Sequence, residues 1–107
     1  MPDPAPFAIT TSADGDRVRL VVEGELDLLA APHLRTALLE ASHHDGATIE
    51  LDLSAVSFID STGISVILQA WQRANAEGGR LVLGATSPVV ARVIEATGLT
   101  DLLAVDH

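Results

Sequence analysis

Four consecutive small or polar residues lie between a strand-like and a helix-like stretch. The segment reads Asp-Ser-Thr-Gly at residues 60–63, directly before an apolar helical stripe that begins at Ile64. Aspartate and serine are preferred at helix N-termini, so the segment could simply cap a helix. A serine there is also exposed, and a phosphate on it would be favoured by free N–H groups and by the helix dipole. Phosphorylation of Ser61 would add nearly two negative charges beside Asp60, and the residues alone leave both interpretations open.

The other residues that could do chemistry point to no metal, cofactor or catalytic site. Adjacent histidines at 43–44 do not chelate easily from one helix face, and we expect them on a solvated helix end with Asp45. A hydrolase that uses Ser61 with a histidine remains an alternative, but G-x-S-x-G is absent and only His33 lies near the relevant loops. No P-loop or G-x-G-x-x-G pattern is present, so we expect no nucleotide cofactor.

Period-two and helical patterns alternate along the chain and predict the elements that position these residues. Strands are expected at residues 7–11, 17–25, 48–53 and 80–84, where apolar residues tend to alternate with polar ones. Helices are expected to begin at Pro32, Ile64 and Pro88, the last two ending at the glycines 78–79 and at Gly98. Residues 1–6 are expected to be a loose N-terminus, and no form is assigned to the apolar tail at 99–105.

This order predicts a single α/β domain over residues 7–107. An N-terminal hairpin is followed by β-α-β-α-β-α, which gives a four-stranded, mostly parallel sheet. Because the strands alternate, helices should cover only one face of the sheet. The loops at 23–31, 54–61 and 84–87 should then leave from the carboxyl edge, where α/β proteins usually bind ligands. We therefore expect Asp27, Asp60, Ser61 and Ser87 to lie near one another.

The composition limits the classes of partner that the chain is expected to bind. The chain has 107 residues, 48% of them hydrophobic, and a formal charge of −9 from 15 acids and six arginines. Such a charge repels nucleic acid and anionic membranes and suits a basic protein partner. There is no cysteine, no signal-peptide pattern and no apolar run of membrane-spanning length, so we expect a cytoplasmic protein.

Three stretches of the chain together resemble one known family. Residues 24–27 read G-E-L-D, residues 56–67 contain F-I-D-S-T-G, and residues 86–90 read T-S-P-V-V before the Gly-Leu at 98–99. In these stretches the sequence resembles the bacterial anti-sigma factor antagonists of the STAS-domain family. Many relatives continue with another C-terminal helix beyond the position that matches His107.

The resemblance implies a regulatory binding protein that is not an enzyme. In the family, an anti-sigma factor with serine kinase activity phosphorylates the serine that matches Ser61, and a phosphatase reverses the modification. The unmodified antagonist binds the anti-sigma factor and frees the sigma factor in transcription regulation during stress, whereas the phosphorylated form does not bind. The implied partner-binding residues are Asp27, Asp60, Ser61, Thr62, Gly63 and Ser87, on a monomer. A STAS scaffold or relay in another signalling assembly is the alternative.

Overall fold

The computed structural model of the chain describes residues 7–42, 46–99 and 104–105. The expected loose N-terminus at residues 1–6 and the histidines at 43–44 lie outside the described residues. In chain order the elements are β1 (Ala8–Asp14), β2 (Arg17–Leu26), α1 (Ala31–Ala41), β3 (Thr48–Ile59), α2 (Ser61–Ala76), β4 (Arg80–Thr86), α3 (Pro88–Thr97) and β5 (Ala104–Val105).

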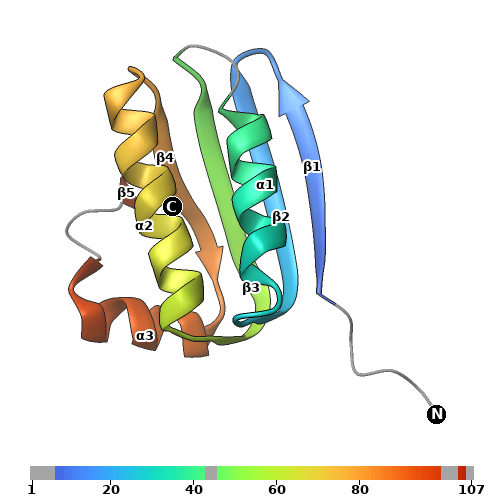
Figure 1. Cartoon of the computed structure of the whole chain (residues 1–107), viewed down its shortest axis with the longest axis vertical. Helices are drawn as coiled ribbons and strands as arrows, with labels where there is room; N and C mark the ends of the chain where they lie inside the picture. The colour runs from blue at the N-terminus through green and yellow to red at the C-terminus, as the bar shows by residue number, and fades with distance from the viewer. Residues whose placement is uncertain (1–6, 43–45, 100–103, 106–107) are drawn as a thin grey trace.

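The strands form one mixed sheet in the order β1-β2-β3-β4-β5. β1 and β2 make the expected antiparallel hairpin around Gly15, whose φ of 65° suits a tight turn, and the remaining neighbours are parallel. Figure 1 shows α1 and α2 side by side on one face of the sheet, with α3 at the end where β4 terminates. The predicted fold class, with an N-terminal hairpin and crossover helices on one face, is confirmed.

The core lies between the sheet and these helices. In β2 the buried residues Val18, Leu20 and Val22 alternate with the exposed Arg17 and Arg19 and the partly exposed Val21, because successive side chains of a strand point to opposite faces. The same face of the sheet continues through the buried aliphatic side chains of β3 and β4. Helices α1 and α2 add their apolar stripes, from which the fully buried Leu34 and Ile67 pack into one cluster.

Three strands end later at the carboxyl edge than predicted, and one of them is β4, which continues to Thr86 instead of ending at Gly84. β3 continues to Ile59 and β2 to Leu26, where loops were expected, and these two residues pair with each other. Register shifts between β2 and β3 explain the error, because they break the period-two pattern that revealed the first half of β3. The buried residues Val56 and Ile59 lie three apart, a spacing that does not indicate a strand.

The sheet also has a short fifth strand that the sequence patterns did not predict. β5 has two residues and pairs in parallel with Val82 and Leu83 of β4. A strand this short carries no measurable alternation. Within the described ranges, no helix is long and apolar enough to cross a membrane.

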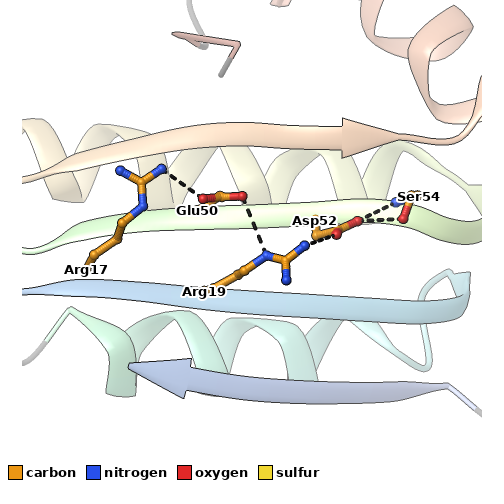
Figure 2. A network of polar contacts seen from close by, with 5 residues as sticks. All are labelled: Arg17, Arg19, Glu50, Asp52 and Ser54. Carbon is orange, nitrogen blue, oxygen red and sulfur yellow. Dashed lines mark hydrogen bonds and ion pairs between the residues drawn. The ribbon is translucent and has the colours of Figure 1, made fainter. Parts of the chain in front are cut away.

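Charged side chains join β2 to β3 on the sheet face away from α1 and α2 (Figure 2). Arg17 Nη2 lies 2.8 Å from Glu50 Oε1, and Arg19 Nη2 lies 2.7 Å from Asp52 Oδ2. Arg19 Nε also lies 3.5 Å from Glu50 Oε2. The network neutralises charge on a face that the helices leave uncovered, and it links two strands far apart in the sequence.

Asp52 is the buried member of this network, with an exposed fraction of 6%. Burial raises the pKa of its carboxyl group, but hydrogen bonds from the Ser54 hydroxyl and N–H and the charge of Arg19 outweigh this effect, so the pKa lies below its usual value. Because the pKa of Asp52 is lower in the folded protein than in the unfolded chain, its ionised carboxyl group stabilises the fold at pH values above the unfolded-state pKa of about 3.9. This stabilisation is lost as the pH falls through the folded-state pKa.

We predict that Asp52→Asn lowers the free energy of unfolding by about 1–2 kcal/mol at neutral pH, since it removes a charge-assisted bond to the half-exposed Arg19. Urea denaturation should show that the difference in free energy of unfolding from the wild type has its full size above about pH 5 and becomes smaller below about pH 4. Glu23→Gln, which removes an exposed acid from β2, is the control and should change little. If Asp52→Asn lowered the free energy of unfolding by the same amount above about pH 5 and below about pH 4, this interpretation would be wrong.

Candidate functional site

Three connections meet at the end of the sheet where the parallel strands finish (Figure 1). They join β2 to α1, β3 to α2 and β4 to α3, and they carry Asp27, Asp60, Ser61 and Ser87. Hydrogen bonds tie the connections together: the Asp60 N–H donates to the Leu26 carbonyl at 3.3 Å, and the Ser87 N–H donates to the Leu53 carbonyl at 3.2 Å. The structure thus brings the expected residues to one end of the molecule.

Asp60 caps α2. Its Oδ1 accepts the N–H groups of Thr62 and Gly63 at 3.0 and 3.1 Å, while its carbonyl accepts the N–H of Ile64 at 3.1 Å. The capping interpretation is therefore correct for Asp60. The next residue, Ser61, is the first of the helix and is exposed, so the cap leaves its side chain accessible.

The cap formed by Asp60 corrects one expectation about how the start of α2 would bind a phosphate on Ser61. The sequence suggested that free N–H groups at the helix start would receive it. In the structure the N–H groups of Thr62 and Gly63 are already bonded to the Asp60 carboxylate. The helix dipole still favours an anion by about 0.3–1 kcal/mol, but the carboxylate of Asp60 opposes it at close range.

Gly63 sets how closely α2 approaches the sheet. It is buried, and a Cβ atom at this position would lie 2.8 Å from the Leu26 carbonyl oxygen, 2.9 Å from Leu26 Cγ and 3.0 Å from Ile59 Cγ1. Separations under 3.0 Å, as in the two contacts with Leu26, are essentially never found for real Cβ atoms. Glycine is therefore required for the first turn of α2 to pack against the ends of β2 and β3.

Asp27 organises the turn that leads into α1. Its Oδ1 accepts the N–H groups of Leu29 and Ala30 at 3.1 Å each, and its carbonyl accepts the N–H of Ala31 at 2.9 Å. Aspartate commonly closes such turns with its own side chain. The turn leaves two leucines in solvent, since Leu28 is 68% and Leu29 82% exposed.

Ser87 differs from the other expected site residues because its hydroxyl group is buried and already makes hydrogen bonds within the protein. The Oγ donates to the Val56 carbonyl at 2.6 Å and accepts the Val90 N–H at 3.4 Å. This side chain caps α3 and ties it to β3. Its role is therefore to hold the start of α3 against β3 from inside the protein.

Exposed apolar side chains also occur at this end of the sheet, and the sequence patterns did not predict them. In the described part of the chain, the exposed large hydrophobic residues are Leu28, Leu29, Phe58 and Val89. All four belong to the connections or element ends at the Ser61 end of the sheet, and we call them the apolar rim. Leu28 and Leu29 could have been noticed, because they precede Pro32 and lie outside the apolar stripe of α1. Apolar residues gathered at one site on a soluble protein often mark an interaction surface.

Within residues 7–42 and 46–99, no three histidine, aspartate or glutamate side chains are arranged to hold a metal ion. The geometry of this end instead combines an accessible hydroxyl, two turn-forming carboxylates and the apolar rim. Such a surface can bind another protein and can be changed by modification of the hydroxyl.

We predict that Gly63→Ala destabilises the protein by about 1–3 kcal/mol, because the added methyl group meets backbone and buried side-chain atoms. In an unrestricted helix the same change would stabilise by up to about 1 kcal/mol. Ser65→Ala, at an exposed position of the same helix, is the control. Thermal or urea unfolding measures both, and a Gly63→Ala protein as stable as the wild type would show that α2 does not depend on this close approach.

Comparison with known proteins agrees with the fold. The family model described as "Mlab, STAS domain" matches residues 9–104. The anti-sigma-B factor antagonist of Listeria monocytogenes is 34% identical over 94 residues, which are 88% of this chain and 82% of that protein.

Solved structures of anti-sigma factor antagonists share the architecture. One from Mycobacterium paratuberculosis aligns with a TM-score of 0.84 at 25% identity, over 98% of this chain and 89% of that one. SpoIIAA in its unphosphorylated form aligns with a TM-score of 0.77 at 28% identity, over 94% and 89% of the two chains. Its phosphorylated form gives 0.72 at 27% identity, over 94% and 92%. By sequence and by fold, this chain belongs to the STAS-domain family, in which these relatives are anti-sigma factor antagonists.

Proposed function

We propose that this protein is an anti-sigma factor antagonist that is switched by phosphorylation on Ser61. In its unmodified form it docks, through the Ser61 end of the sheet, on an anti-sigma factor that has serine kinase activity, and the sigma factor is released. Phosphorylation by that partner ends the interaction, and a phosphatase restores it. The protein acts in the cytoplasm as a binding module without catalysis of its own.

The observation that carries this proposal is the exposed Ser61 at the first position of α2, at the same end as the apolar rim. A kinase needs an accessible hydroxyl, and a docking partner needs apolar surface to bury. The names of the relatives support the same role, since they are anti-sigma factor antagonists and SpoIIAA has been solved in phosphorylated and unphosphorylated forms.

The expected partner-binding residues divide into two groups by depth. Asp27, Asp60 and Thr62 are partly exposed at the Ser61 end of the sheet, so we assign them to the contact surface. Gly63 and Ser87 are buried, and we assign them the role of holding that surface in place. Their substitution should change binding through the position of α2 and α3.

The proposed switch rests on the cost of burying a new charge. A phosphate on Ser61 adds about −1.5 to −2 charges beside Asp60 on a chain whose formal charge is already −9. The N–H groups of Thr62 and Gly63, which could have donated hydrogen bonds to the phosphate, already donate to the Asp60 carboxylate. The phosphate therefore stays on the surface, and docking the apolar rim on a partner would strip it of water at a cost of several kcal/mol.

We predict that phosphorylation of Ser61 weakens binding to the cognate anti-sigma factor about a hundredfold or more, which corresponds to about 2.8 kcal/mol. Ser61→Ala should bind and resist phosphorylation, and Ser61→Glu should bind weakly. Ser65→Ala, an exposed serine one turn along α2, is the matched control and should behave as the wild type.

Mass spectrometry of the kinase-treated protein identifies the modified residue, and calorimetry measures the affinities. Thr62 is the competing hydroxyl at the helix start. Phosphate on Thr62 or elsewhere, or equal affinity of the phosphorylated and unmodified forms, would refute the proposal.

We also predict that Leu29→Ser weakens this interaction about tenfold or more without changing the unfolding midpoint. The side chain is 82% exposed, so it contributes little to the fold, whereas burying a leucine at an interface is worth about 1.5–3 kcal/mol. Surface plasmon resonance and urea unfolding of one preparation test both parts. Unchanged affinity would show that the apolar rim does not contribute to docking at Leu29.

A further inference from the structure

A second surface feature lies between α1 and α2, away from the apolar rim. It is a groove of about 40 Å³ whose walls are the facing sides of the two helices. On α1 its lining begins at Arg35, and on α2 it ends at Arg73. On α2 the lining runs from Val66, about 8 Å along the helix from Ser61, to Arg73, about 18 Å from it, at 1.5 Å of rise for each residue. The groove therefore does not include the phosphorylation site.

The floor of the groove is apolar and its size is limited. Leu38, Ile49 and Val66 are buried beneath it, and Leu39 and Ala70 are partly exposed along its sides. Pockets for small-molecule ligands usually measure about 300–1,000 Å³. A groove this small accommodates one aliphatic side chain at most, which favours part of a protein over a free ligand.

The charge at this groove is opposite to that of the chain. The two charged residues that line it are Arg35 and Arg73, although acids outnumber arginines by 15 to six in the whole chain. Arg17 and Arg19 are engaged by Glu50 and Asp52 on the other face of the sheet. Within the described ranges, neither the Arg35 nor the Arg73 guanidinium has an ion-pair or hydrogen-bonding partner.

Helix electrostatics account for only one of these two arginines. Arg73 is in the last turn of α2, where the helix dipole stabilises a cation. Arg35 is in the first half of α1, where the dipole offers no such stabilisation. Two guanidinium groups beside an apolar floor form a surface that suits carboxylates flanking an aliphatic side chain.

We propose that the groove between α1 and α2 binds an acidic amphipathic helix of a second protein, with one aliphatic side chain on the floor and carboxylates at Arg35 and Arg73. This is the helix-in-groove mode of recognition. Because the groove is separate from Ser61, binding there is independent of the phosphorylation state. The protein would then carry two partner surfaces, of which only one is switched.

The test uses the full chain labelled with ¹⁵N and a panel of synthetic helical peptides of about 16 residues. Each peptide carries one central leucine flanked by glutamates at i±3 or i±4 spacing, and its counterpart carries lysines instead. We expect the acidic peptides to shift the amide signals of Leu39, Gln69 and Ala70, and the lysine peptides to leave them unchanged.

Two charge-matched variants decide whether the arginines recognise the peptide. Arg35→Glu/Arg73→Glu should weaken binding about tenfold or more. Arg80→Glu/Arg92→Glu changes the net charge equally at positions that do not line the groove, and it should bind as the wild type does. Ser61→Glu should also retain binding.

Four results would overturn the proposal. The first two are that no acidic peptide shifts the amide signals, or that both double variants lose the same amount of affinity. The other two are that Ser61→Glu no longer binds the peptides, or that the same amide signals shift when the protein concentration is raised without peptide. The last result would identify a second copy of this chain as the occupant.

Discussion

The first turn of α2 packs directly against the ends of β2 and β3, and the arrangement of the candidate site depends on this contact. Gly63 has no room for a side chain beneath the Leu26 carbonyl, and the Asp60 N–H donates to the same carbonyl. Asp60 then fixes the first N–H groups of the helix with its carboxylate. Ser61, one residue further along, is held at an exposed position by neighbours that cannot move without disturbing the core.

This constraint determines what the proposed phosphorylation of Ser61 would change in the surface around it. The apolar rim comes from the connection between β2 and α1, the end of β3 and the start of α3, so its shape depends on how these elements meet. Each connection is held by a short polar contact, from Asp27, Asp60 or Ser87. A phosphate on a surface built in this way changes the charge of the surface while the fold beneath it stays in place.

The sequence predicted the three helices, the first four strands and the placement of the site residues at one end of the sheet, because these follow from local patterns. Alternation in β2 and the glycine and proline signals around α3 act over a few residues, and crossover connections then determine which strand ends share an edge. The burial of Ser87 and Asp52 could not be predicted, since each depends on a partner far along the chain, at Val56 and Arg19. The second half of β3 was not predicted because its register shifts against β2, a distant strand, interrupt the period-two pattern.

The central claim is that phosphorylation changes the surface at Ser61 and leaves the start of α2 intact. Amide hydrogen exchange of Thr62 and Gly63, followed by NMR in the unmodified and phosphorylated proteins, tests it most directly, because these N–H groups donate to the Asp60 carboxylate. We expect equal protection of both amides in the two forms, with shift changes centred on Ser61. Loss of their protection on phosphorylation would contradict the account, since the switch would then act by unfolding the first turn of α2.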